Sequence, residues 1–495
     1  MSYSKNYGFP GRYLEPRAKN YSNQLKKRII MTKVTRFAPS PTGALHIGGV
    51  RTALFNYVYA KQNKGKFLIR IEDTDAERST REFETNILKG LSDLGINPDE
   101  LPVRQSERSE LYQHAVKEII ESGKAYYCNC SKERLDEMRA KQQSKGLKPQ
   151  YDGKCRNLNL QADASTVLRL KTPQDGELIF HDLVRGEVIF QNSELDDLIL
   201  LRSDGSPTYH LCNVIDDYEQ KVTTVVRGED HLSNTPRQIH IQHALGYPSL
   251  EYAHLPMVLG PDKKRLSKRN AVTSLQDYFD QGYLESSMIN MLARLGWSKG
   301  DKEIFYIEDL ISDFRIQEVQ KAGAIFDSAK LDWINNHHLA ALPFDDFMQK
   351  LIPFLEIVGI DYTQKGNSKD IIAAMRSSKP TLLGVAKDLA PYFSPVDSYD
   401  EKAADKFLRG AESVLEFVQR KLNSLEVWNE KSIDHALQEA QTALSLPTPK
   451  LNQPIRIAMT GSTQSPSLGL TLSLFDAVEV NHRIDAALKY LANQH

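Results

Sequence analysis

The sequence predicts an α/β N-terminal half with a parallel sheet, interrupted by an α+β insertion and followed by an all-α C-terminal half. Two apolar runs, 34–37 and 66–71, flank a segment with helical spacing, the pattern of a right-handed βαβ unit. Short β-like runs replace this pattern between 126 and 217. Beyond residue 274, apolar residues recur at helical spacing almost throughout.

The first predicted strand leads into a loop and a helix suited to bind an anion. The helix is predicted from about Gly48 to Lys64, with Gly65 as its C-terminal cap. Its N-terminus offers free N–H groups and a favourable dipole. Three glycines leave room for a ligand to lie against the backbone, namely Gly43, Gly48 and Gly49. The spacing matches neither the dinucleotide fingerprint nor the P-loop.

The next elements follow in order. The strand at 66–71 ends in Glu72-Asp73-Thr74-Asp75, which should share a sheet edge with residues 36–40. Helices are then predicted at 82–94 and 111–122. The insertion is predicted to contain a helix at 131–145 and strands at 167–170, 177–180 and 187–190. Asp204-Gly205 predicts a tight turn between two strand-like runs, 198–202 and 209–214.

The parallel pattern resumes after the insertion. Strands are predicted at 222–227 and 256–259, and Thr235 is the expected N-cap of the helix between them. The second of these strands leads into a basic loop, 265–269. A basic run on its own usually marks a solvated surface, and a single histidine in a loop is usually a structural residue. Together, the two loops of one interrupted domain predict a phosphate clamp.

Composition limits the classes of protein. The 495 residues carry a formal net charge of -1, so composition gives no sign of a nucleic-acid partner, and no apolar run is long enough to span a membrane. Four cysteines in so long a chain are not a disulfide framework, and we predict a reducing, cytoplasmic location. Residues 1–30 are basic and almost free of acids, and we expect a disordered extension, with Met31 as an alternative start.

The two loops resemble a known family. "PSPTGALHIGG" resembles the HIGH motif of class I aminoacyl-tRNA synthetases, and "RLSKR" resembles their KMSKS motif. The form "RFAPSPTG…HIGG" with "RIEDTD" is that of bacterial-type glutamyl-tRNA synthetases. The resemblance covers nearly everything after Met31, through "SDGSPTYHLCNVIDD", "VVRGEDH", "DYFDQGYL", "LGWSKGDKEIF" and "LNQPIRIAMTGS".

The resemblance implies a class I synthetase fold and a two-step reaction. ATP, accompanied by Mg²⁺, would activate L-glutamate to glutamyl-adenylate, and the acyl group would pass to the 3′ terminal adenosine of tRNA-Glu. It assigns catalysis to His46, Ser267 and Lys268. It assigns ATP binding to His46, Gly48, Gly49, Arg265, Leu266, Ser267, Lys268 and Arg269. Two positions depart from the family motifs, because Gly49 replaces the second histidine of HIGH and Arg265 replaces the first lysine of KMSKS.

The resemblance also implies a glutamate pocket. Its residues would be Arg36, Ala38, Ser40, Glu72, Tyr209, Asn213 and Arg227. Glu72 would bind the ammonium group, while Arg36 and Arg227 would bind the carboxylates, which a guanidinium can pair bidentately. Any one of these arginines alone would more often form a surface ion pair. Their shared position at predicted strand ends or in adjoining motifs favours the pocket.

Three cysteines suggest a metal site. Cys128, Cys130 and Cys155 bracket a short helical segment, and thiolates are good zinc ligands. Relatives that bind zinc have histidine two residues after the last cysteine, where this chain has Asn157. Tyr151 or water could complete the shell, and the alternative is a lost site with three leftover thiols. Cys212 is predicted to pack in a core.

These predictions divide the chain into six segments. They are a basic extension (1–30), a first half of a Rossmann-type catalytic domain (31–125), an inserted acceptor-end and zinc subdomain (126–217), the second catalytic half (218–272), a helical stem-contact domain (273–335) and a helical anticodon-binding domain (336–495). The last segment has scattered basic residues, each of which surface solvation would explain: Arg376, Lys379, Arg420, Lys421 and Arg456. Only the resemblance makes it an RNA-reading domain.

Partners and alternatives follow from the same resemblance. We expect a monomer that binds tRNA-Glu, L-glutamate and ATP and has no membrane partner. The alternatives are a non-discriminating enzyme that also charges tRNA-Gln, a tRNA-modifying glutamylase and a non-catalytic RNA-binding relative. The glutamylase would lack the C-terminal domain, and a non-catalytic relative would have lost His46 or Lys268. A glutaminyl-tRNA synthetase would end in β-barrels, and a free-standing nucleotidyltransferase would not need the second half of the chain.

Overall fold

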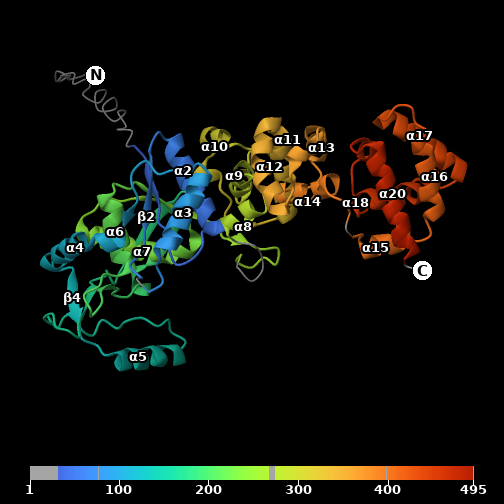
Figure 1. The fold of residues 1–495 in the computed structure, drawn as a ribbon. Helices are drawn as coiled ribbons and strands as arrows, with labels where there is room; N and C mark the ends of the chain where they lie inside the picture. The colour runs from blue at the N-terminus through green and yellow to red at the C-terminus, as the bar shows by residue number, and fades with distance from the viewer. Residues whose placement is uncertain (1–31, 76, 267–273, 397, 494–495) are drawn as a thin grey trace, which may run out of the picture.

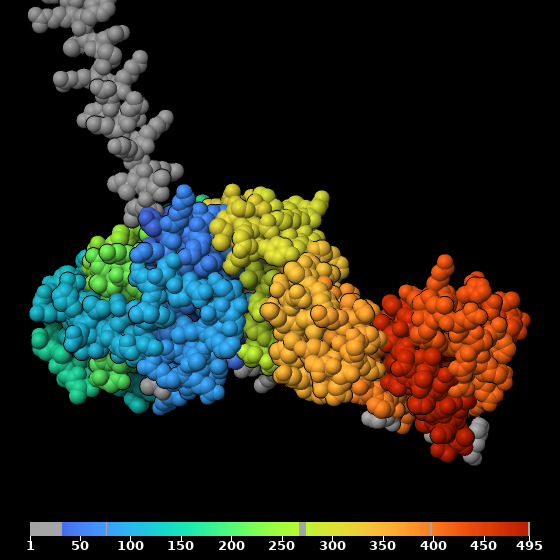
Figure 2. All heavy atoms as spheres, turned by 45° about the horizontal axis from the view of Figure 1, so that its top comes forward, coloured from blue at the N-terminus to red at the C-terminus, as the bar shows by residue number. Residues whose placement is uncertain are grey.

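The computed structural model describes residues 32–75, 77–266, 274–396 and 398–493, and the predicted extension 1–30 lies outside them. The molecule is elongated, with the α/β half at one end and the last helices at the other (Figures 1 and 2). Within the described ranges, no helix combines the length and the apolar character needed to cross a bilayer.

A parallel sheet forms the centre of the α/β half. Strands pair in the order β1 (Val34–Phe37), β2 (Lys66–Ile71) and β3 (Val103–Arg104), each parallel to the next. Helix α2 (Ile47–Gln62) connects β1 to β2, which confirms the predicted βαβ unit. All of β1 and all of β2 after its first residue are buried, which explains why both strands read as continuous apolar runs.

Further strands extend this layer. They pair in the order β7 (Gly186–Gln191), β6 (Glu177–Asp182), β10 (Glu251–Leu255) and β9 (Thr224–Gly228), with only the β6–β7 pair antiparallel. Strand β9 lies beside β1, because Thr223 N donates to Val34 O at 2.9 Å. The segment 126–217 therefore contributes two strands to the main layer.

The rest of that segment forms a smaller antiparallel sheet. Its strands are β4 (Ala125–Cys128), β5 (Val167–Leu170) and β8 (Ile199–Leu201), in that order. The predicted helix is present as α5 (Lys132–Ser144), but none of its residues is buried. It lies at the margin of the α/β half (Figure 1).

The other elements of the α/β half pack around the main layer. The helices are α3 (Arg81–Asp93), α4 (Ser109–Glu121), α6 (Tyr209–Glu219) and α7 (Thr235–Leu245). Short 3₁₀ helices are η2 (Gln105–Glu107), η3 (Asn192–Glu194) and η4 (Glu229–Asn234). A small parallel pair joins β11 (Val258–Leu259) to β12 (Ala324–Ile325), which ties the α/β half to the helices that follow it.

Several local expectations were wrong. The run 209–214 is the start of helix α6 and not a strand, and strand β10 was missed. Helix α2 ends at a cap on Asn63, and Lys64 takes the positive φ that we expected of Gly65. Gly65 is needed for another reason, since a Cβ there would lie 1.8 Å from Lys33 O. Helix α7 already includes Thr235, with Asn234 as its N-cap.

The C-terminal half is helical, as predicted. Its helices are α8 (Leu275–Asp280), α9 (Glu285–Arg294), α10 (Ile307–Asp313), α11 (Ser328–Ala341), α12 (Phe344–Val358), α13 (Ser368–Met375), α14 (Leu382–Phe393), α15 (Glu401–Ala403), α16 (Glu412–Asn423), α17 (Glu430–Leu444), α18 (Thr448–Thr460), α19 (Leu468–Ser473) and α20 (Ala477–Ala492). Short turns η5 (Ile316–Glu318), η6 (Tyr362–Gln364) and the π-helical η7 (Ala404–Leu408) separate some of them. One apolar core joins α2 to α9, α10 and α11, and another fills the helices from α12 onward.

Candidate active site

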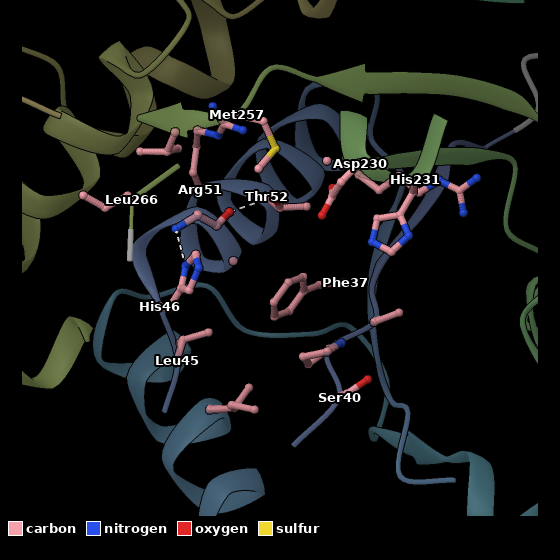
Figure 3. Close-up of a pocket in the computed structure, with 18 of the residues that line it drawn as sticks. Phe37, Ser40, Leu45, His46, Arg51, Thr52, Asp230, His231, Met257 and Leu266 are labelled. Atoms are coloured by element: carbon pink, nitrogen blue, oxygen red, sulfur yellow. Dashed lines mark hydrogen bonds between the residues drawn. The ribbon is translucent and has the colours of Figure 1, made fainter. Parts of the chain in front are cut away.

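A cavity of about 540 Å³ opens where β1, the N-terminus of α2 and β9 meet. Among its lining residues are many of the predicted ones: Arg36, Ala38, Ser40, His46, Gly48, Gly49, Arg227, Arg265 and Leu266. Figure 3 shows His46 on one side of this cavity and Asp230 and His231 across from it. The structure thus brings the described members of the predicted ATP set and the outer part of the predicted glutamate pocket into one space.

His46 is the N-cap of α2. Its Nδ1 accepts a hydrogen bond of 2.9 Å from Gly48 N, so the hydrogen of the neutral ring is on Nε2. An Nε2–H group can donate to a phosphate oxygen, and the helix N-terminus beside it favours a negative charge. The capping bond therefore sets His46 as a hydrogen-bond donor toward an anion.

Two glycines of the loop have different reasons to be glycine. A Cβ on Gly48 would lie 2.8 Å from His46 Cε1, so a larger residue would displace the capping ring. A Cβ on Gly43 would have nothing within 4 Å, so the protein itself does not demand glycine there. Gly48 thus leaves room for the capping ring of His46, while Gly43 lies in the cavity wall where a ligand would approach.

A buried charge cluster lies behind the cavity. It consists of Arg36, Arg70, Glu72, Asn213, Asp216 and Asp217, all less than one-tenth exposed. Asp217 Oδ1 accepts from Arg36 Nε at 2.9 Å and from Arg70 Nη1 at 2.6 Å. Asn213 Oδ1 accepts from Nη2 of the same two arginines. This cluster fixes the Arg36 guanidinium at the cavity wall.

The cluster shifts the ionisation of its carboxyl groups in opposite directions. Burial alone would raise the pKa of Asp217, but the charges of Arg36 and Arg70 outweigh it and hold the pKa below its ordinary value. Burial raises the pKa of Glu72, and the more distant arginines only partly oppose it. A cation near Glu72 would therefore stabilise its ionised form.

Three predicted glutamate residues do not line the cavity directly. Asn213 Nδ2 donates to Glu72 Oε1 at 2.5 Å, and both are buried behind Arg36. Tyr209 Oη lies 3.3 Å from Nδ1 of His231, which is itself in the lining. Tyr209 and Asn213 are on helix α6, in the run 209–214 that we expected to be a strand.

Sequence reasoning missed several residues of the site. Asp230 and His231 line the cavity, and the quoted motif "VVRGEDH" contained the signal for them. Arg51, one turn into α2, donates to Pro256 O and to Leu295 O, which attaches the helix to the following segments. No pattern in the sequence linked Arg70 or Asp217 to Arg36. Ser267, Lys268 and Arg269 lie outside the described residues.

The three predicted metal ligands come together in the smaller sheet. The Sγ atoms of Cys128, Cys130 and Cys155 all lie within 4.8 Å of one another. The Tyr151 hydroxyl lies 3.3 Å from Cys128 Sγ and 3.6 Å from Cys130 Sγ. Asn157 is exposed. Ligands of a tetrahedral zinc–thiolate site lie about 3.8 Å apart, so the three thiols are close enough to share one zinc ion.

Most of the basic residues noted in the helical half are engaged with the protein. Arg376 donates to Leu339 O and Leu342 O, and Arg456 donates to Ser465 Oγ and Pro466 O. Lys421 pairs with Glu439 at 2.9 Å. Arg376 and Arg456 therefore stabilise a helix end and a loop, which makes these two arginines poor candidates for RNA contacts.

The fold and the cavity are those of a class I tRNA synthetase. The family model for the catalytic domain of class I tRNA synthetases (E and Q) matches residues 33–333, and the model for the anticodon binding domain matches residues 346–488.

Named relatives narrow this class. The chain is 42% identical to glutamate–tRNA ligase 2 of Halorhodospira halophila over 462 residues, which is 92% of this chain and 98% of the relative. It is 42% identical over 469 residues to glutamate–tRNA ligase of Francisella tularensis subsp. novicida, covering 92% and 99% of the two chains. A crystal structure of the glutamate tRNA ligase from Elizabethkingia meningosepticum in complex with its amino acid superimposes with a TM-score of 0.81 at 31% identity, covering 93% of this chain and 100% of that one. The chain belongs to the glutamate–tRNA ligase family.

Proposed function

We propose that this chain activates L-glutamate with ATP and transfers the glutamyl group to the 3′ end of tRNA-Glu. One observation carries the proposal: a single cavity joins the helix N-terminus at His46 to the guanidinium groups of Arg36 and Arg227. The first feature suits a triphosphate and the second suits a dicarboxylic amino acid. Their adjacency would place a substrate carboxylate next to the α-phosphate of ATP.

The glutamate end of the cavity uses charges that are already buried and held in place. Arg36 is clamped by Asp217 and Asn213, and Arg227 is 6% exposed. Pre-oriented guanidinium groups bind a carboxylate without a large loss of side-chain freedom. Glu72, whose pKa burial raises, would gain an ion pair with the substrate ammonium group.

The activation step needs no general base. The substrate α-carboxylate is ionised at neutral pH and attacks the α-phosphate of ATP, and pyrophosphate leaves. The protein's part is then to position the reactants and to stabilise the charge that develops on phosphate oxygens. We assign this work to His46, through Nε2–H, and to Ser267 and Lys268 of the basic loop. Magnesium would arrive with ATP and supply further charge neutralisation.

The direct test is a charging assay. Purified protein, ATP and labelled glutamate are incubated with tRNA-Glu or with tRNA-Gln, and with labelled glutamine in a parallel reaction. We expect labelled tRNA-Glu and no transfer of glutamine. Labelled tRNA-Gln as well would identify a non-discriminating enzyme. Failure to label tRNA-Glu would refute the proposal.

The basic loop has a kinetic test of its own. Loss of one group that stabilises charge in the transition state typically costs about 10²- to 10³-fold in kcat. We therefore expect Lys268→Ala to lower kcat by this amount, with a much smaller change in the KM for glutamate. A variant that raised the KM and kept kcat would remove Lys268 from the transition-state role.

We also propose a structural zinc ion held by Cys128, Cys130, Cys155 and the Tyr151 oxygen. Cys155 N donates to Tyr151 Oη at 2.9 Å, and the Arg169 guanidinium lies 3.9 Å above the Tyr151 ring. Both contacts orient the phenol toward the thiols. A closed set of four ligands would fix the smaller sheet without taking part in the reaction.

Elemental analysis tests the zinc proposal. We expect about one zinc per chain in wild-type protein produced in zinc-containing medium. Cys130→Ser should lose it, and Tyr151→Phe should bind it more weakly in a chelator titration. Cys212→Ser is the matched control, because Cys212 is fully buried in a separate apolar cluster. Wild-type protein without zinc would contradict the proposal.

The remaining assignments concern the whole molecule. We propose that residues 336–495 bind the anticodon region of tRNA, that the segment 126–217 contacts its acceptor end, and that the enzyme acts as a cytoplasmic monomer. The elongated shape supports this division, because the last helices lie at the opposite end of the molecule from α2, whose N-terminus lines the cavity (Figure 1). Footprinting of bound tRNA-Glu with a chain that ends at residue 342, just after helix α11, tests it, since anticodon protection should disappear.

A further inference from the structure

A buried hydrogen-bonded chain lies behind Arg227. His254 and Arg227 are register partners on the parallel strands β10 and β9. Arg227 Nε donates to His254 Nε2 at 3.2 Å, and His254 Nδ1 lies 2.6 Å from Asp182 Oδ2. The imidazole is fully buried and the Asp182 carboxyl almost so. The chain thus runs from the cavity wall to the end of strand β6.

The donors and acceptors of this chain have one consistent direction. Ionised Asp182 only accepts, so the imidazole hydrogen is on Nδ1. Nε2 is then an acceptor, which is what the Arg227 Nε–H group requires. A second restraint comes from Thr235, whose Oγ1 accepts from Arg227 Nη2 at 2.9 Å. Two of the three nitrogens of Arg227 are therefore fixed from behind.

The third nitrogen is the one left for a ligand. Arg227 Nη1 is buried, and no hydrogen-bond partner for it exists among the described residues. A buried donor without a partner is costly, and a substrate carboxylate would relieve that cost. Because Arg227 lines the cavity, the two fixed nitrogens direct the remaining one to the substrate.

Asp182 is itself held rigidly. Its Oδ1 accepts from Val184 N at 2.9 Å and from Arg185 N at 2.8 Å, and its carboxylate also accepts from His254 N. Asp182 belongs to the segment 126–217, whereas Arg227 and His254 belong to the segment that follows it. The orientation of a cavity residue therefore depends on a side chain from the inserted segment.

We propose that His254 is a positioning residue for the glutamate site, and that Asp182 fixes the tautomer in which it accepts from Arg227. The proposal rests on the proposed role of Arg227 in binding a glutamate carboxylate. It makes glutamate affinity depend on an acceptor at the position of His254 Nε2. The affinity for ATP should not depend on this acceptor.

Two amide substitutions separate the two ends of the imidazole. In His254→Gln the side-chain amide reaches the position of Nε2, where its oxygen can accept from Arg227. In His254→Asn the amide reaches only the position of Nδ1, where it can donate to Asp182 but offers nothing to Arg227. A hydrogen bond to a charged group is worth about 10- to 100-fold in affinity. We expect His254→Asn to weaken glutamate binding by roughly 10-fold or more, and His254→Gln by only a few-fold.

The measurements are the glutamate Kd by calorimetry and the KM values for glutamate and for ATP. The ATP KM should stay within about two-fold of wild type in both variants. His240→Asn is the matched control, because His240 is a buried imidazole of the same half whose Nε2 contacts Asn192 at 3.1 Å. It should leave the glutamate Kd unchanged. Thermal unfolding of each variant verifies that it folds.

The possible outcomes separate the two proposals. Equal glutamate Kd values for wild type, His254→Gln and His254→Asn would overturn the positioning role, as would parallel losses for glutamate and ATP. If Arg227→Ala keeps wild-type glutamate affinity, the assignment of Arg227 fails and the positioning role fails with it. If wild-type protein binds glutamate but charges no tRNA, the proposed function fails, and the Kd series still tests His254.

Discussion

The α/β half and the last helices differ in the kinds of side chain that they bury. Behind the cavity lie several charged side chains that are almost inaccessible to solvent, including Arg36, Arg70, Glu72, Asp216 and Asp217. From residue 336 to 493, the buried polar side chains that the structure describes are few: His338, Ser368, Thr460, Thr471 and Arg483. The core of this part is otherwise apolar.

The difference has a physical meaning. Burying a charge is costly unless it is paired, and paired buried charges add little to stability compared with apolar side chains of similar size. The α/β half retains such charges next to a cavity, where a charged amino acid would complete their pairing. The interior of the helical part has no charged substrate to pair with, so its buried side chains mainly contribute to the stability of the fold. Substitutions in the two parts should therefore differ in kind.

The largest effect is expected from Asp217→Asn. It removes the charge that pairs with both Arg36 and Arg70 and leaves two buried guanidinium groups under-compensated. Breaking a buried ion pair from one side costs about 3–5 kcal/mol. Urea unfolding followed by the fluorescence of Trp297, which is buried in the apolar core that joins α2 of the α/β half to α9, α10 and α11, should show a loss of this size.

An exposed pair in the same half is the control for this prediction. Lys66 and Glu100 form an ion pair at 2.7 Å, with both side chains more than half exposed. Glu100→Gln should leave the unfolding curve essentially unchanged, since exposed pairs contribute little. If both variants unfolded like wild type, the buried charge cluster would not be the feature that distinguishes the two halves.

A buried arginine in the helical part should behave differently. Arg483 donates to Met459 O at 2.6 Å and to Ser394 O at 2.9 Å, and its guanidinium lies 4.5 Å from the Phe475 ring centre. Arg483→Ala leaves the buried acceptor Met459 O without its donor, which costs roughly 1–3 kcal/mol. We expect a lower unfolding temperature but an unchanged KM for glutamate at 20 °C. A selective rise in that KM would contradict the division of roles.

How far the sequence predicted the molecule depends on how local each signal was. The βαβ unit of β1, α2 and β2 was predicted correctly, because its periodicity lies within the unit itself. The run 209–214 was predicted to be a strand because it follows the tight-turn signal Asp204-Gly205. Its helical state is selected by packing, since Leu211, Val214 and Ile215 share an apolar core with Tyr112 of α4. Tertiary contacts of this kind are not visible in a single sequence.

The site shows the same limit. The resemblance to family motifs located His46, Gly48 and Arg36, which the structure brings to one cavity. It could not find Asp217, which lies 181 positions from Arg36 in the chain, or His254, which contacts Arg227 only because two parallel strands share a register. The cavity residues belong to motifs that can be recognised in the sequence, whereas the residues that hold them in place are brought together only by folding.

The smallest expected effect is a difference between the two halves in how much stability they lose in mild acid. Burial lowers the pKa of His210, His231 and His240 to about 4 in the α/β half, and that of His338 to about 4 at the edge of the helical part. The unfolded chain binds protons near the ordinary pKa of 6.5, so the folded state loses stability as the pH falls from about 6.5 toward about 4.

Three of these four histidines are in the α/β half, so that half should be the more acid-sensitive. Trp297 reports on it, while Trp428, which donates to Phe475 O, reports on the helical part. In single-reporter variants, the Trp297 transition should fall by roughly a few degrees between pH 7 and pH 6, and the Trp428 transition by less. Replacing His240 by Gln should reduce the shift of the Trp297 transition, because glutamine cannot take up the proton. Equal shifts of the two transitions would show that buried titratable groups do not distinguish the halves.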